Sequence, residues 1–219
     1  MNSKCLQTSE GVLDALFFNY QELSSCEREV RAAASLLVDT FRSGGKLLVC
    51  GNGGSAADSE HIVGELMKSF RFKRPVDRAF LDAYRDVNGA DAPSWLEGAL
   101  PAFSLVSQTA FATAFSNDGA AVGVFAQQVY GYSEYGDVLL AISTSGNSAN
   151  VVEAAKVARA KGVRVVSLTG SKKSALSSLS DVSIRVPRDE VFRIQELHLP
   201  IYHALCAAVE AELFCGDCI

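Results

Sequence analysis

Five short runs of apolar residues recur along the chain, each bounded by Gly, Ser, Asp or Pro. Runs of this length, rich in Leu and β-branched residues, are typical of strands buried on both faces of a parallel sheet. The predicted strands are Lys46–Cys50, Ala102–Val106, Val138–Ile142, Arg164–Leu168 and Val182–Val186. Helical patterns lie between the runs, so the fold class is predicted to be α/β, a three-layer sandwich around a five-stranded parallel sheet.

The clearest helical pattern covers residues 147–161, where Asn147 or Ser148 can cap the start and Gly162 can end the helix. Two more helical segments, about 9–23 and 26–43, precede the first strand. They make residues 1–43 an N-terminal helical segment.

A long amphipathic helix from about Arg193 to Phe214 closes the chain. Pro200 lies inside it and lacks a backbone donor, which predicts a kink or a late helix start. Residues 75–101 break the strand–helix rhythm with three prolines and the only Trp, and they are interpreted as an insertion that starts with a short helix. The 219 residues are otherwise predicted to form a single domain.

The net charge, the apolar runs and the cysteines indicate which partners and which cellular compartment to expect. The net charge is −5, whereas a nucleic-acid-binding surface usually needs a basic stripe. No apolar run reaches the ~18 residues of a membrane span, and the polar N-terminus does not resemble a signal peptide. The expectation is a cytoplasmic protein with free thiols and with no nucleic-acid or membrane partner. Cys215 and Cys218 have the spacing of a redox or metal pair, but no second pair accompanies them.

A glycine-rich turn follows the first predicted strand, within residues 46–58. Glycines let a ligand approach the backbone, and amides at a helix start attract anions. The turn lacks the Lys of a P-loop and the full dinucleotide motif, so a plain strand-to-helix turn explains it equally well. The candidate ligand-binding residues here are Asn52, Gly53, Gly54 and Ser55.

A second loop, rich in hydroxyl groups, follows the third predicted strand. Its hydroxyls belong to Ser143, Thr144, Ser145 and Ser148. In an open parallel sheet, ligands bind beyond the carboxyl ends of the strands. Two such loops at equivalent places therefore favour a phosphate site over two ordinary turns.

The ionisable candidates lie on two predicted helices. His61 and Glu65 share a helix face at i,i+4 spacing, which suits a metal, acid–base chemistry or an ordinary surface pair. Gln195, His198 and His203 lie on the last helix, where the histidines are either functional or packed in the core.

These motifs together resemble the sugar isomerase (SIS) domain family and, within it, the phosphoheptose isomerases. The matching stretches are 51–58, 136–140, 143–148, 168–170 and 193–198. The resemblance implies a homotetramer, oligomerised through residues 1–43, with active sites at subunit interfaces. It implies aldose–ketose isomerisation through an enediol, of sedoheptulose 7-phosphate to D-glycero-D-manno-heptose 7-phosphate. Glu65 would move the proton between C1 and C2, and His203 would shuttle protons at the substrate oxygens or assist ring opening.

The resemblance also assigns contacts and a metal. Substrate contacts fall on Asn52, Gly53, Gly54, Ser55, Asn117, Asp118, Ser143, Thr144, Ser145, Ser148 and Gln195. Some members bind zinc, here through His61, Glu65, Gln195 and His203. Gln195 and His203 are eight residues apart, a rise of roughly 12 Å on a straight helix, so His198 would be the easier second ligand by geometry.

Two departures from the family pattern leave the sugar open. Ser69 stands where the family commonly has an Arg, and Phe192 stands where an acidic residue is frequent. They suggest a related phosphosugar as an alternative substrate. A second alternative is a non-catalytic SIS tetramer that binds the replication initiator. That branch lacks the glutamate and the last-helix histidine, whereas this chain has Glu65 and His203.

Overall fold

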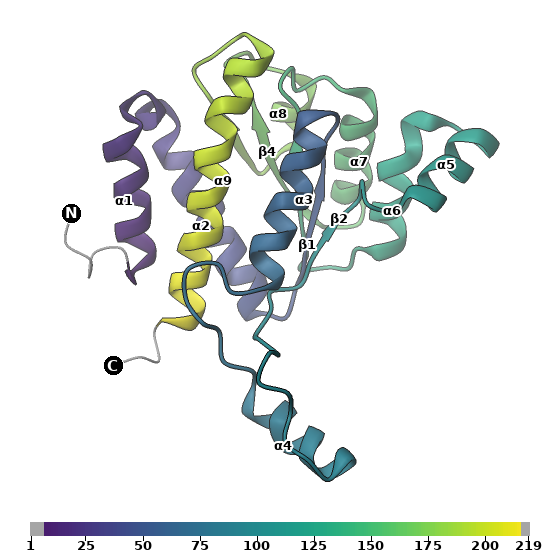
Figure 1. The fold of residues 1–219 in the computed structure, drawn as a ribbon. Helices are drawn as coiled ribbons and strands as arrows, with labels where there is room; N and C mark the ends of the chain where they lie inside the picture. The colour runs from purple at the N-terminus through teal and green to yellow at the C-terminus, as the bar shows by residue number, and fades with distance from the viewer. Residues whose placement is uncertain (1–6, 216–219) are drawn as a thin grey trace.

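The computed structural model describes residues 7–215, in which five parallel strands form one sheet in the order β2-β1-β3-β4-β5 (Figure 1). The strands are β1 Leu47–Cys50, β2 Ala102–Ser104, β3 Val138–Ile142, β4 Arg164–Thr169 and β5 Val182–Arg185. The predicted α/β fold and all five strands are confirmed. The strand order reverses between β1 and β3, since β2 is added on one side of β1 and β3 on the other. Ligands bind at such a switch point in doubly wound folds.

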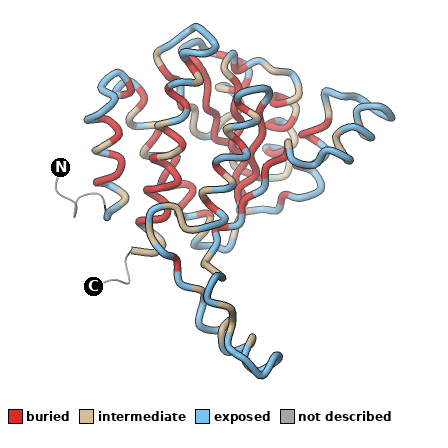
Figure 2. The backbone as a smooth tube through the Cα atoms, in the orientation of Figure 1, coloured by how far each residue is buried: buried red, intermediate tan, exposed pale blue. Residues whose placement is uncertain are grey.

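Helices cover both faces of the sheet. One face packs against α1 Ser9–Asn19, α2 Glu27–Arg42, α3 Gly54–Met67 and α9 Val191–Phe214. The other face packs against α6 Val124–Tyr132, α7 Ala149–Ala160 and α8 Ala175–Leu179. Side chains of β1 alternate between the two cores, since Leu47 and Val49 enter the first while Leu48 and Cys50 enter the second. The sheet is therefore buried on both sides, as Figure 2 shows.

Several predicted boundaries change in the structure. Strand β2 ends at Ser104, two residues early, because it is an edge strand paired with β1 over three residues. The first predicted helix is shorter, and the 3-10 turn η2 Gln21–Cys26 joins α1 to α2. Helix α7 agrees with its prediction: Ser148 is at the N-cap position, and Gly162 follows with a φ of 74°.

Helix α9 begins at Val191 and continues through Pro200, so the prediction of a late start is wrong. A proline nitrogen cannot bond the carbonyl four residues earlier, which costs the helix one hydrogen bond at Glu196. Burial on three sides compensates, because α9 packs against α1, α2 and α3. None of the helices within residues 7–215 combines the length and apolarity that crossing a membrane requires.

The predicted insertion forms an arm that projects away from the sandwich (Figure 1). It contains α4 Arg78–Asn88, with Asp77 accepting a hydrogen bond from the backbone N–H of Phe80 as N-cap and Gly89 ending the helix at a φ of 66°. No residue of α4 is buried. The arm therefore adds little to the core of this chain.

Candidate active site

Two loops meet at the switch point of the sheet. The loop at residues 51–53 joins β1 to α3, and the loop at 143–148 joins β3 to α7. The side-chain amides of Asn52 and Asn150 exchange two hydrogen bonds of 2.9 Å between these segments. Because β1 and β3 are paired neighbours, the N-termini of α3 and α7 come together, and both favour an anion.

Gly53 and Gly54 shape the first loop. Gly53 has a φ of 56°, a conformation that favours glycine. Gly54 starts α3, and a Cβ at Gly54 would lie 2.5 Å from Nε2 of Gln195. Gln195, on α9, therefore packs directly on the predicted phosphate loop.

Gly54→Ala is expected to raise the KM for a sugar phosphate about tenfold, which equals about 1.4 kcal/mol of lost binding. The added methyl must displace Gln195 or the loop. Gly64→Ala is the control on the same helix, since a Cβ there meets nothing within 4 Å and Ala favours the helix. Steady-state kinetics give the KM of both variants. Equal KM values would contradict the prediction that the binding site needs a glycine at position 54.

The second loop is held by its own hydroxyl groups. Ser143 Oγ lies 3.0 Å from Ser148 Oγ and accepts a hydrogen bond of 3.1 Å from the Gly146 N–H. Ser145 Oγ accepts from the N–H of Asn147 at 3.1 Å. These bonds set the loop in one shape, which is the preorganisation that an anion site needs.

A hollow of about 260 Å³ opens on Thr144 and Ser145 of the second loop, and Lys172, Lys173 and Arg188 also line it. These three cations follow β4 and β5, and no motif in the sequence marks them. Their proximity to the hydroxyl-rich loop becomes visible only when the parallel strands align their carboxyl ends. Asp189 also lines the hollow and lies 4.0 Å from Lys172, and Arg188 pairs with Glu22, so part of this positive charge is compensated.

Three ionisable groups meet farther along α3. Nε2 of His61 lies 3.1 Å from Oε1 of Glu65 and 3.4 Å from Nε2 of His203 on α9. Lys68 donates to the other Glu65 oxygen at 2.9 Å, and Tyr202 Oη lies 3.1 Å from Nδ1 of His61. The structure therefore brings together the predicted pair His61–Glu65 and the predicted His203.

The protonation states suit proton transfer near neutral pH. Partial burial would raise the pKa of Glu65, but its hydrogen bond to the Lys68 ammonium and the nearby His61 ring outweigh burial and lower it. Burial and the neighbouring His61 lower the pKa of His203. Glu65 is therefore an ionised base and His203 a neutral ring, which can accept or donate a proton.

Two more groups adjoin this cluster. The hydroxyl of Tyr202 lies near the carboxyl of Asp58, which is one helical turn before His61. Burial raises the pKa of Asp58, and its Oδ2 is buried without a hydrogen-bond partner. Burial and the charge of Asp58 raise the pKa of Tyr202, so its hydroxyl stays protonated.

A buried ion pair supports the end of α3. Nε of Arg74 donates to Oε1 of Glu210 at 2.8 Å, and both side chains are 0% exposed. Glu210 also accepts from the backbone N–H groups of Phe70 at 2.8 Å and Arg71 at 2.7 Å. One carboxylate thus organises the whole turn that follows α3.

The Arg74 guanidinium reaches the main chain of the catalytic candidate. It donates to the carbonyl of Leu66 at 2.5 Å and to that of Glu65 at 2.8 Å. These are among the last carbonyls of α3, which lack partners within the helix. Arg74 therefore fixes the backbone of Glu65. Nothing in the sequence distinguished Arg74 from the neighbouring surface cations.

Gln195 lies apart from the ionisable cluster. Gln195 packs on Gly54 at the start of α3. Glu65 is eleven residues after Gly54 on the same helix, which is roughly 16 Å along the helix axis. Of the four predicted zinc ligands, His61, Glu65 and His203 are therefore the three whose side chains lie together. No group of three or more His, Cys, Asp and Glu within residues 7–215 has an arrangement that would hold a metal ion. Zinc binding stays a prediction.

Other predicted residues also lie away from the loops. Asn117 and Asp118 end the exposed helix α5 Thr109–Asp118, which packs on α6 and the 3-10 turn η3 Ala121–Gly123 at the edge of the fold (Figure 1). Cys215 is half-buried after α9, and Cys218 is outside the described residues.

His198 is a core residue, as the alternative interpretation held. Its side chain is 0% exposed and neither ring nitrogen has a hydrogen-bond partner, although the ring lies beside the backbone of Thr169. Burial lowers the pKa of His198 to about 4. The ring is therefore neutral in the folded protein and unsuited to the role of ligand or proton carrier in the cluster.

His198 is expected to make stability depend on pH. Between pH 6.5 and about 4 the unfolded chain binds a proton that the folded chain does not, so stability falls as pH falls. The loss from this residue is about 3 kcal/mol, at 1.36 kcal/mol per pKa unit. Urea unfolding at pH 7 and pH 4.5 measures it. The His198→Leu variant should lose less stability over this range, and an equal loss would contradict the assignment.

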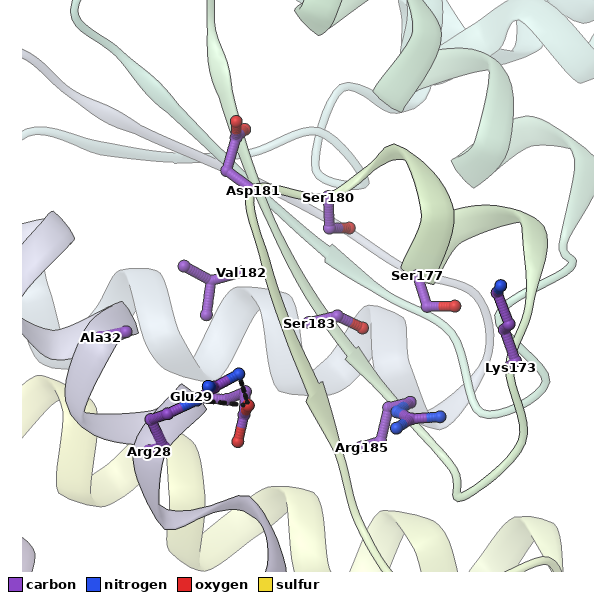
Figure 3. A pocket seen from close by; sticks show the side chains of 10 residues that line it. All are labelled: Arg28, Glu29, Ala32, Lys173, Ser177, Ser180, Asp181, Val182, Ser183 and Arg185. Carbon is purple, nitrogen blue, oxygen red and sulfur yellow. Dashed lines mark hydrogen bonds and ion pairs between the residues drawn. The ribbon is translucent and has the colours of Figure 1, made fainter.

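A second hollow, of about 560 Å³, lies between α2, α8 and β5 (Figure 3). Arg28, Lys173 and Arg185 line it, but so do the carboxylates Glu29 and Asp181, so its charges largely compensate. Except for Lys173, which also lines the hollow at Thr144, these residues lie at the β5 edge of the sheet. This hollow is therefore not part of the candidate active site.

Comparison with known proteins identifies the family of this chain. A family model described as the SIS domain matches residues 20–98 and 94–170. The phosphoheptose isomerase of Geobacter sp. (strain M21) is 40% identical over 185 residues, 84% of this chain and 84% of that protein. The phosphoheptose isomerase of Akkermansia muciniphila is 35% identical over 198 residues, 90% of this chain and 93% of that protein.

Solved structures give the same result. The phosphoheptose isomerase from Neisseria gonorrhoeae superposes with a TM-score of 0.71 at 32% identity, over 90% of this chain and 94% of that one. The one from Francisella tularensis gives 0.73 at 31% identity, over 87% and 90%. The chain belongs to the SIS domain family. Within that family, these four relatives are all phosphoheptose isomerases.

Proposed function

We propose that this protein is an aldose–ketose isomerase that converts sedoheptulose 7-phosphate to D-glycero-D-manno-heptose 7-phosphate. The cluster of Glu65, His61 and His203, three turns along the helix that starts at the paired loops, carries the proposal. The phosphate and the reacting carbons of this sugar are at opposite ends. Helix α3 offers an anion site at its start and a base near its end, which suits such a substrate.

In the proposed reaction Glu65 takes the proton from C1 of the ketose, and the electron pair forms the enediol. Glu65 then returns the proton to C2. His203 moves the hydroxyl proton from O1 to O2, so no atom or electron is gained or lost overall. A carboxylate that faces both carbons and a neutral imidazole suit these two transfers.

The proposal includes a homotetramer with active sites between subunits. Asn117 and Asp118 support it, because they are exposed on α5, away from the loops of their own chain. In a neighbouring copy they would complete a site. Sedimentation analysis should give the mass of four chains, and a monomer would contradict this part of the proposal.

The decisive assay incubates the protein with sedoheptulose 7-phosphate in D₂O, with and without Zn²⁺. The expected result is an aldoheptose 7-phosphate that carries deuterium at C2, since an enediol exchanges its proton with solvent through Glu65. Unphosphorylated sedoheptulose should react poorly, because the loops have no phosphate to bind. Turnover of another ketose phosphate alone would favour the alternative substrate, and a complete lack of isomerisation would refute the enzyme.

The non-catalytic alternative is less well supported. A SIS tetramer that only binds the replication initiator would have no need of an ionised Glu65 hydrogen-bonded to His61. The relatives compared above are isomerases by name.

A further inference from the structure

Residues 170–176, which leave β4 and enter α8, are attached at both ends to the hydroxyl-rich loop after β3. At the start of this connecting segment, the N–H of Gly170 donates to the carbonyl of Thr144 at 3.0 Å. Near its end, the N–H of Leu176 donates to the carbonyl of Gly146, also at 3.0 Å. The connecting segment is therefore fixed against the loop, and the two together line the hollow of about 260 Å³.

Lys173 lies in the middle of the connecting segment. Of the other cations that line the hollow, Lys172 has the carboxylate of Asp189 at 4.0 Å, and Arg188 pairs with Glu22. Within the part of the chain that the structure describes, no carboxylate pairs with the ammonium of Lys173. Its side chain is exposed, so the charge is available to a bound anion.

Lys173 also lines the larger hollow of Figure 3, and the two hollows differ in charge. The carboxylates of Glu29 and Asp181 line the larger hollow and would repel an anion there. In the smaller hollow, the carboxylate of Asp189 already contacts two polar side chains of the connecting segment, and the loop adds hydroxyl donors. An anion is therefore favoured on the side of Lys173 that adjoins the hydroxyl-rich loop.

The ammonium group adds what the loop by itself does not offer. Neutral hydroxyl and amide donors bind phosphate oxygens but carry no charge. Hydrogen bonds from an ammonium to an anionic oxygen are roughly twice as strong as neutral ones. Lysine presents its charge on a flexible four-carbon stem, so Lys173 can turn toward a phosphate that the loop holds.

We propose that Lys173 binds the phosphate of the sugar substrate and is a specificity-determining residue of the active site. The inference rests on the proposed isomerase function. The hydroxyl-rich loop would hold phosphate oxygens, and Lys173 would supply the positive charge that favours a phosphate over an uncharged group. Its role is confined to binding, because the proton-transferring groups, Glu65 and His203, meet near the far end of α3.

A direct test titrates the protein with inorganic phosphate at low ionic strength and measures the Kd. Lys173→Ala should raise the Kd about five- to tenfold, and Lys173→Arg, which keeps the charge, should stay close to the wild type. The matched control is Lys156→Ala on α7, which removes the same charge from an exposed pair with Glu153 and should leave the Kd unchanged. Equal Kd values for Lys173→Ala and Lys156→Ala overturn the inference, and so does a wild type that binds no phosphate. No turnover is needed, so the result stands even if the proposed function fails.

The kinetic test separates KM from kcat with sedoheptulose 7-phosphate as substrate. Lys173→Ala should raise KM about five- to tenfold and leave kcat within about twofold, since a contact made equally in the ground state and the transition state affects KM alone. The difference from the wild type should shrink in about 1 M salt, which screens an exposed charge. A Lys173→Ala variant with the KM of Lys156→Ala overturns the inference, whereas an inactive wild type refutes the proposed function instead.

Discussion

Glu210→Gln is expected to lower the free energy of unfolding by about 3–5 kcal/mol, because it leaves the Arg74 guanidinium buried without its counter-charge. The carboxylate also accepts two backbone N–H groups from the turn after α3. An amide can donate where a carboxylate only accepts, so at least one of these contacts becomes unfavourable.

Urea unfolding of Glu210→Gln measures the loss, and Glu212→Gln is its control on the same helix. Glu212 pairs with Arg42 at 2.7 Å, but the two side chains are 40% and 54% exposed. An exposed pair contributes about 1 kcal/mol at most. Equal losses in the two variants would show that the buried pair has no special role.

The pairing of Arg74 with Glu210 is a feature of the structure that the sequence could not predict. Arg74 and Glu210 are 136 residues apart, and each lies in a stretch that also contains ordinary surface charges. Their pairing depends on how α9 crosses the end of α3. Tyr202 was hidden for a similar reason, since an aromatic residue on an apolar helix is normally a packing residue.

The strands and the two loops could be predicted because their signals are local. Four consecutive buried residues form β1, and the glycine turn that follows needs the φ of 56° found at Gly53. The i,i+4 spacing of His61 and Glu65 gave their shared helix face directly. By contrast, the position of Gln195 against Gly54 required the packing of α9 on α3.

The structure shows what Ser69, one of the two departures from the family pattern, contacts. Ser69 turns into the body of the protein: its Oγ accepts from the Arg74 N–H at 3.0 Å, and its own N–H donates to Glu97 at 2.9 Å. Glu97 belongs to the inserted arm. The inserted arm and Ser69 therefore form one local arrangement.

Glu65→Gln is expected to reduce kcat for sugar-phosphate isomerisation about 10²- to 10⁴-fold, the range for loss of a general base. The amide cannot accept the C1 proton, but it has the shape of the carboxylate. The carbonyl of residue 65 keeps its bond from Arg74, so the fold and the KM should change little.

Glu60→Gln is the matched control on α3, where Glu60 accepts only a surface hydrogen bond of 2.9 Å from Ser107. Its kcat should stay within about twofold of the wild type, as expected for a surface change. The Lys68 ammonium lowers the pKa of Glu65, so this carboxylate stays ionised at pH values where an ordinary glutamate begins to be protonated. Wild-type activity should therefore persist into mild acid. If Glu65→Gln turned over like Glu60→Gln, another group would have to carry the proton between C1 and C2.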